Sequence, residues 1–108
     1  MELGKVINVL IKRKGLTQVD VAKRIGKSTT ALSQIIKGNY NPNPDTLDKI
    51  CKVLDVPQPI LYFLTISEKD IPSDKLEIYR MLAPSIKEFL IKIFGEEKEQ
   101  LLDEVKLS

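Results

Sequence analysis

Short amphipathic segments, each bounded by a glycine, a proline or a helix-capping residue, fill the first 66 residues of the chain. In the first segment, apolar residues recur at the spacing of one helix face, at Leu3, Val6, Ile7, Leu10 and Ile11. No segment alternates apolar and polar residues with the period of two that indicates a strand. The pattern therefore predicts an all-α fold of short helices joined by turns of two to six residues.

Capping residues predict where the helices begin and end. Thr17 is a good N-cap, and Asp20 three residues later makes a near capping box. Ser28 suits the N-cap of the next helix, and Asn43, followed by a proline and an aspartate, starts the one after it. Gly15, which follows a basic run, suits a helix end. The predicted helices span residues 3–14, 18–25, 28–37, 44–54 and 59–64.

The composition fits one globular domain, or a compact domain with an extension, because 43% of the 108 residues are hydrophobic and 30% are charged. One cysteine and no histidine exclude an intramolecular disulfide, a Cys/His metal site and the Ser/His and Cys/His catalytic pairs. No apolar run reaches the roughly 18 residues that a membrane span needs, and the N-terminal residues do not resemble a signal peptide. We therefore expect a cytoplasmic protein with no metal, no cofactor, no enzymatic activity and no membrane partner.

Charge is divided unequally along the chain. Residues 1–66 hold ten Lys and Arg against five Asp and Glu, whereas residues 67–108 hold seven against ten. A basic first part and an acidic second part indicate two tasks, and the first part is the better match for a polyanion.

Residues 67–108 form a second region, a predicted helical extension. Its first residues, SEKDIPS, are polar and indicate a linker. A broad apolar stripe at helical spacing follows, and Pro84 within it predicts either one kinked helix or two helices that meet there. The stripe is too apolar to stay exposed on a lone helix, so it either packs on the first domain or forms an interface with a second copy. The residues assigned to a dimer interface are Tyr79, Leu82, Ile86, Phe89, Leu90, Ile93 and Phe94.

The second and third predicted helices have the spacing of a helix-turn-helix. Gln18, Ala22, Gly26, Leu32 and Ile35 lie at offsets of 0, 4, 8, 14 and 17. A small residue at Ala22 lets two helices approach closely, Gly26 makes the turn, and the last two residues hold the third helix across the second. The stretch LTQVDVAKRIGKSTTALSQIIKG, followed by PNPDTLDKICKVLDVP, resembles the lambda-repressor-like, Cro-type helix-turn-helix family, also called the XRE family.

This resemblance covers about residues 3–65 and implies a five-helix DNA-binding domain within residues 1–66. Its recognition helix, about residues 28–37, would enter the major groove of double-stranded DNA. In the family, two turns of one face of this helix contact bases, which here gives Thr29, Thr30, Ser33 and Gln34. Phosphate contacts are implied for Gln18, Lys27, Ser28, Lys37, Asn39, Tyr40 and Asn41. The two threonines are a departure, because some relatives carry glutamines there.

The side-chain chemistry of the third predicted helix independently supports the DNA contacts that the resemblance implies. A major groove about 12 Å wide admits a helix to the base edges only when its leading side chains are small, and Thr, Ser and Gln are short or flat. Gln34 can pair with adenine through two hydrogen bonds, and a Thr methyl can contact the thymine methyl. Lys27 and Lys37 stand at the two ends of this face, where phosphates would lie. The basic run at residues 12–14 is either a further phosphate contact or a solvated helix end.

These inferences predict a sequence-specific transcriptional regulator, a repressor, that binds a palindromic operator as a homodimer. Two alternatives keep the same fold. In an antitoxin-type autoregulator, residues 67–108 would bind a toxin in place of a second copy. In a protein-interaction adaptor, the third helix would bind a protein, but its outer face would then be apolar or charged, and here it is polar.

Overall fold

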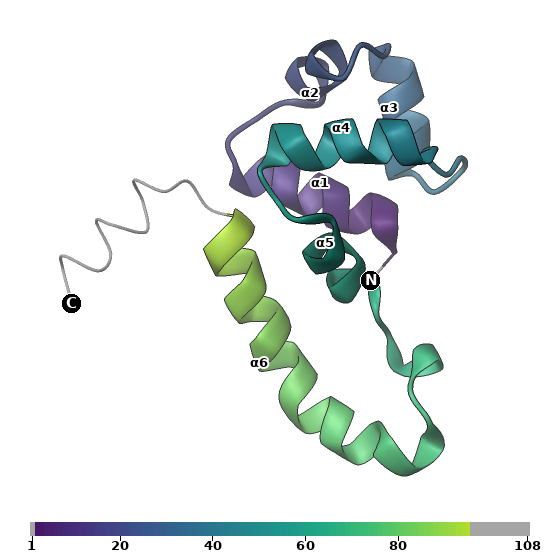
Figure 1. Ribbon diagram of the computed structural model, residues 1–108, viewed down its shortest axis with the longest axis vertical. Helices are drawn as coiled ribbons and strands as arrows, with labels where there is room; N and C mark the ends of the chain where they lie inside the picture. The colour runs from purple at the N-terminus through teal and green to yellow at the C-terminus, as the bar shows by residue number, and fades with distance from the viewer. Residues whose placement is uncertain (1, 96–108) are drawn as a thin grey trace, which may run out of the picture.

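The computed structural model describes residues 2–95, which fold into six α-helices and two short 3-10 helices with no strand among them (Figure 1). The predicted all-α fold is confirmed. The first five helices are α1 (Leu3–Arg13), α2 (Gln18–Arg24), α3 (Thr29–Ile36), α4 (Pro44–Leu54) and α5 (Gln58–Thr65). The chain then forms η1 (Glu68–Asp70), η2 (Ser73–Lys75) and α6 (Leu76–Gly95). Residues 96–108 of the predicted extension lie outside the described residues.

Side-chain caps fix the starts of α2, α3 and α4, as the sequence predicts. The Thr17 hydroxyl accepts a hydrogen bond from the Asp20 N–H at 3.1 Å, and the Asp20 carboxylate accepts one from the Thr17 N–H at 3.4 Å. Ser28 caps α3 by accepting a bond from the Ala31 N–H at 3.0 Å, and Asn43 caps α4 in the same way. Each cap satisfies a backbone donor that the first turn of a helix leaves unpaired, so each helix begins at a defined residue.

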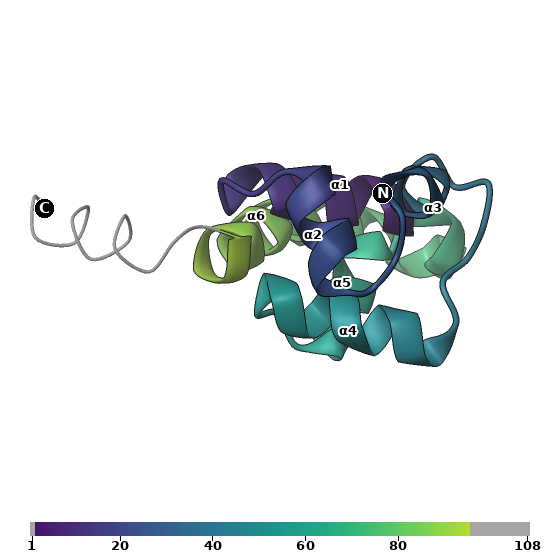
Figure 2. The same cartoon turned by 90° about the horizontal axis from the view of Figure 1, so that it is seen from above.

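The core is shared by helices α1 to α5. α1 packs against α3, α5 and α6, while α2 packs against α3 and α4, and α4 packs against α5. Figure 2 shows α1 and α4 on opposite sides, with α2 and α5 between them. The largest fully buried side chains are Ile7, Leu10, Ile11, Val21, Ile25, Leu32, Ile50, Leu54 and Leu61. Burial of these apolar faces holds α3 in a fixed orientation.

A glycine near the start of α1 brings the end of α3 into direct backbone contact. A methyl group on Gly4 would lie 2.3 Å from the Ile36 carbonyl oxygen and 2.6 Å from the Ile35 carbonyl oxygen. Atoms cannot approach so closely, so the two helices reach this distance only because Gly4 has no side chain. The sequence pattern gives no sign of this contact, which fixes α3 against α1.

α6 is one helix that continues through Pro84, so the alternative of two separate helices is excluded (Figure 1). Its last turn approaches α1, where a methyl group on Gly95 would lie 3.1 Å from a side-chain carbon of Leu10. Leu90 and Phe94 pack against the core that α1 to α5 form. The extension therefore folds back on its own chain. Among residues 2–95, no helix combines the length and the apolar character needed to cross a membrane.

Polar contacts attach the linker to α6. The Tyr79 hydroxyl donates to the Ile66 carbonyl at 2.9 Å, and the Lys87 ammonium donates to the same carbonyl and, at 3.1 Å, to the Tyr79 oxygen. Arg80 forms an ion pair with Glu68 at 2.7 Å, and its hydrogen bond and charge lower the pKa of the Glu68 carboxyl. These contacts join the segment after α5 to α6.

Candidate nucleic-acid interface

α2 and α3 form the helix-turn-helix at one end of the molecule (Figure 1). The turn between them passes through Gly26, whose φ of 71° is left-handed and suits glycine. Ala22 and Leu32, two of the residues that define the predicted spacing, are buried. This packing turns the opposite side of α3 toward solvent.

The outward side of α3 is uncharged. Thr29 and Thr30 in its first turn are exposed, whereas Ser33 and Gln34 in the next turn are half-buried. No acidic residue stands in that first turn, so the partial positive charge of the helix N-terminus is not cancelled there. Ser28 accepts the capping bond, and its hydroxyl hydrogen can still be donated to a phosphate. The face can therefore approach an anionic backbone and present hydrogen-bonding groups to base edges.

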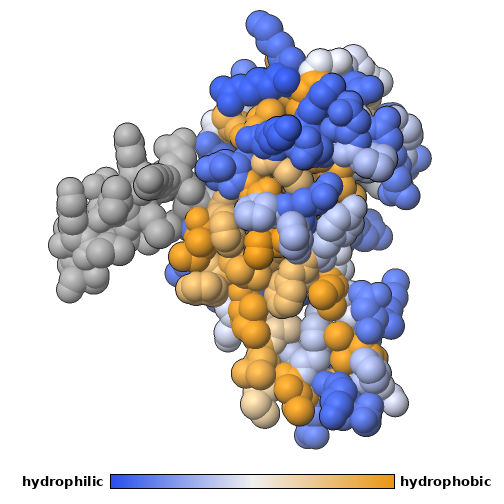
Figure 3. Space-filling model, viewed as in Figure 1, coloured by the Kyte–Doolittle hydropathy of each residue, from blue (hydrophilic) through white to orange (hydrophobic). Residues whose placement is uncertain are grey.

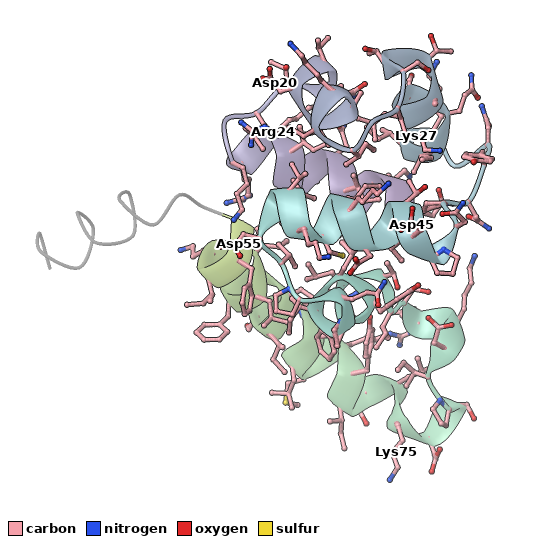
Figure 4. The ribbon with its side chains drawn as sticks, turned by 45° about the horizontal axis from the view of Figure 1, so that its top comes forward. Asp20, Arg24, Lys27, Asp45, Asp55 and Lys75 are labelled. Atoms are coloured by element: carbon pink, nitrogen blue, oxygen red, sulfur yellow. The ribbon has the colours of Figure 1, made fainter. Side chains whose placement is uncertain are left out.

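Cations border this face. Lys27, labelled in Figure 4, lies in the turn before α3, and Lys37 follows the last turn of the helix; both are exposed. Lys23 and Arg24 add two exposed cations in the last turn of α2. Positive charge at the margins and a neutral centre is the arrangement that phosphates on either side of a DNA groove require.

Gln18, at the start of α2, is held by a residue of α1. Its side-chain amide donates a hydrogen bond to the Asn8 side-chain oxygen at 3.3 Å. The second hydrogen of that amide can still be donated to a phosphate, as predicted for this glutamine. Asn8 is not among the residues predicted from the sequence, because the contact joins two helices and no local pattern records it.

The loop after α3 contacts the second turn of the helix. Asn39 Nδ2 donates a hydrogen bond to Gln34 Oε1 at 2.8 Å. Tyr40 is half exposed and lines, together with Lys27 and Gln34, a hollow of about 320 Å³. Asn41 is exposed in the same loop. The fold thus brings three of the predicted contact residues around one hollow and ties the Asn39 side chain to a predicted base-contacting residue.

The residues predicted to form a dimer interface lie on two sides of α6. Leu90 and Phe94 are partly buried against the core, and Tyr79 is bonded to Ile66, so these three side chains are turned toward their own chain. The other four lie on an exposed face together with two residues that the sequence did not single out. This outer face of α6 consists of Ile78, Met81, Leu82, Ile86, Phe89 and Ile93, which are between 42% and 72% exposed. Figure 3 shows hydrophobic side chains gathered along α6.

Comparison with known proteins agrees with this geometry. Residues 8–57, which run from α1 to just past α4, match the family model described as helix-turn-helix. Over 55 residues the chain is 38% identical to the "ImmF control region 10 kDa protein" of Bacillus phage phi105, a match that covers 51% of this chain and 61% of that protein. No solved structure matches the chain at a significant level. Residues 8–57 are therefore similar to helix-turn-helix proteins, and over these residues the resemblance to the Cro/XRE-type family that the sequence predicts is confirmed.

Proposed function

We propose that the protein is a sequence-specific DNA-binding regulator, and specifically a repressor, that inserts α3 into the major groove. The observation that carries the proposal is the outward, uncharged face of α3 with a lysine at each end. Thr29 and Thr30 lead this face and are short enough to reach base edges, and Gln34 follows one turn later. Lys27 and Lys37 stand where the phosphates border the groove.

The name of the phage relative, a "control region" protein, supports a regulatory role. A domain that occupies promoter DNA can block transcription through binding alone. Repression therefore needs no group beyond the DNA-contacting face itself, and it is the mode of regulation that we propose.

We further propose that the outer face of α6 joins two copies of the chain. Ile78, Leu82, Ile86, Phe89 and Ile93 recur every three or four residues and form one stripe along the helix. Contiguous apolar surface of this kind is unusual on a monomer, and the same stripe of a second copy would cover it in a two-fold dimer. Two α3 helices would then contact half-sites about 34 Å apart, and the operator would be palindromic.

An antitoxin-type autoregulator would use the same outer face of α6 for a toxin and the same face of α3 for DNA. Sedimentation of the purified chain separates the two proposals, because a dimer supports the repressor and a monomer supports the antitoxin. A protein-interaction adaptor is disfavoured by the polar face of α3, since the centres of protein interfaces are apolar and aromatic.

Fluorescence titration against duplex DNA at several salt concentrations tests the proposed DNA contacts. Each phosphate neutralised by Lys or Arg releases counterions, so the logarithm of affinity should fall linearly with the logarithm of salt concentration. We expect this fall. Affinity that does not change with salt would contradict the phosphate contacts.

A further inference from the structure

A Schellman motif ends α3 and places Asn39 beside Gln34. The Asn39 N–H donates to the Gln34 backbone carbonyl at 3.0 Å, and the Gly38 N–H donates to the Ile35 carbonyl at 3.1 Å. Gly38 has a φ of 81°, the left-handed conformation that this motif requires at the residue after the cap. The backbone therefore holds Asn39 against the last turn of the helix.

The side chains at these two positions of a Schellman motif usually make a hydrophobic contact. Here two amides replace it, with Asn39 Nδ2 donating to Gln34 Oε1 at 2.8 Å. Asn39 is exposed and Gln34 is half-buried, so the bond competes with water and contributes little net stability. Stability alone does not account for the amide pair.

We propose that Asn39 is a positioning residue that orients the Gln34 amide for base recognition. The proposal rests on the proposed function, in which α3 enters the major groove. With Oε1 directed at the Asn39 amide, the Nε2 group is directed away from Asn39, and its hydrogens are the donors that the held amide can offer to a base. Holding the long Gln34 side chain in one orientation also reduces the conformational entropy that it loses on binding.

A fixed donor selects for bases that offer acceptors in the major groove. These acceptors are purine N7, guanine O6 and thymine O4. Cytosine presents its N4 amino group there, which is a donor, so cytosine is the base that Gln34 should disfavour most.

This role differs from the phosphate contact that the sequence predicts for Asn39. A phosphate contact affects every DNA sequence alike, whereas orientation of Gln34 affects one base pair. Base preference at that pair therefore distinguishes the two roles.

The test measures the affinity of the full chain for four duplexes that differ in the base at one operator position. That position is the one where Gln34→Ala changes the preference. Asn39→Ala removes the amide donor, and Asn39→Asp replaces it with an acceptor that should attract Nε2 and turn Oε1 toward the base. Asn41→Ala is the matched control, because it removes the same kind of side chain from the same loop.

We expect Asn39→Ala to lose about two- to tenfold of the base discrimination at this position, as an ordered side chain is released. Asn39→Asp should weaken binding to all four duplexes through its charge, and the relative affinity for cytosine should rise. Asn41→Ala removes a predicted phosphate contact, so it should weaken binding to all four duplexes alike and leave the discrimination between them unchanged. Adding Asn39→Ala to Gln34→Ala should cause no further loss of discrimination, because both changes act through one amide.

An equal loss of affinity for all four bases in Asn39→Ala would overturn the positioning role while leaving the proposed function intact. A wild-type protein that prefers no DNA sequence would overturn the proposed function and this proposal with it. Circular dichroism melts of each variant show that the compared proteins are folded.

Discussion

The outer faces of α3 and α6 are both left uncovered by the fold, yet their chemistry is opposite. The face of α3 is short and uncharged, with threonines leading it and lysines at its ends. The outer face of α6 carries six large apolar side chains. The inner sides of both helices pack on the same hydrophobic core, so the difference lies in the surface that each helix offers to a partner.

This difference indicates what each surface would bind. Base edges in a DNA groove offer hydrogen-bond donors, acceptors and methyl groups, so short polar side chains suit them. A protein partner instead favours large apolar side chains that exclude water at the centre of an interface. We infer that α3 contacts DNA and that α6 contacts protein.

Among these variants, Gly4→Ala should cause the largest loss of stability, because it disturbs the contact between α1 and α3. The new methyl would lie 2.3 Å from a backbone oxygen of α3, and backbone cannot yield as a side chain can. Overpacking costs about 1–3 kcal/mol and more where relaxation is blocked, so we expect a loss of about 3 kcal/mol or more in the free energy of unfolding. Urea denaturation measures it, and DNA binding should be lost as well.

The matched control for Gly4→Ala is Gly95→Ala, which changes the glycine at the end of α6. Its methyl would meet the flexible Leu10 side chain at 3.1 Å, and alanine favours a helix over glycine by up to about 1 kcal/mol. The net change in stability should stay below about 1 kcal/mol. Similar losses in the two variants would contradict the direct contact between α1 and α3.

Phe89→Glu should dissociate the proposed dimer without unfolding the chain. Phe89 is 61% exposed on the outer face of α6, so the folded monomer can accept the carboxylate. Burial of one large apolar side chain stabilises by about 1.5–3 kcal/mol, and a two-fold interface loses two of them. We therefore expect the dimer to weaken by about 3 kcal/mol or more, roughly a hundredfold in its dissociation constant by sedimentation.

Tyr62→Glu is the control for the dimer, because it places the same carboxylate on an exposed aromatic residue of α5, outside the outer face of α6. It should leave the oligomeric state unchanged. Deletion of α6 would be less decisive, since Leu90 and Phe94 also cover the core. Dimers that persist unchanged in Phe89→Glu would exclude the outer face as the interface.

Gln34→Ala and Lys27→Ala should weaken DNA binding in different ways. Loss of Gln34 should remove about 1–3 kcal/mol of discrimination at one base pair. Loss of Lys27 should weaken all sequences alike and reduce the salt dependence by about one phosphate contact. Lys52→Ala, which removes a cation paired with Asp48 on α4, should change neither. An equal loss over all bases in Gln34→Ala would reject its role in base recognition.

Asp20→Asn should have the smallest effect, visible in the dependence of stability on pH. Hydrogen bonds from the Thr17 hydroxyl, at 2.8 Å, and from the Thr17 N–H lower the pKa of the Asp20 carboxyl in the folded protein. Its contribution to stability is therefore present above the ordinary Asp pKa and is lost as pH falls through the lowered folded value. Thermal melts of wild type and Asp20→Asn should differ at about pH 6 and converge in acid.

Glu68→Gln provides the same measurement beside α6, where Arg80 lowers the pKa of Glu68. It should show the same convergence in acid, since its folded pKa is shifted in the same direction. A difference from wild type that stays constant with pH would contradict the role of charge at either site.

Local signals were sufficient to predict most of the helix-turn-helix. Thr17, Ser28 and Asn43 cap the helices that they precede, because a cap joins residues only three apart in the sequence. The helical period likewise places Thr29 and Gln34 on the outward side of α3. That these residues contact bases stays a prediction.

Local sequence patterns do not predict contacts between residues that lie far apart in the chain. Gly4 meets the end of α3, and Asn8 binds Gln18, through the packing of helices whose relative position no local period encodes. The apolar stripe of residues 76–94 is too broad to show from the sequence which residues face α1, so the sequence predicts Leu90 and Phe94 at a dimer interface, whereas in the structure both pack on the core.

Selection of bound sites from a random duplex pool tests most directly whether α3 recognises base edges as part of a dimer. We predict an enriched sequence with two-fold symmetry whose half-sites lie about 34 Å apart, one helical turn of DNA. Gln34→Ala should lose the preference at one base pair in each half-site. A pool that is bound but yields no enriched sequence would contradict base recognition by α3, and a single asymmetric site would contradict the dimer.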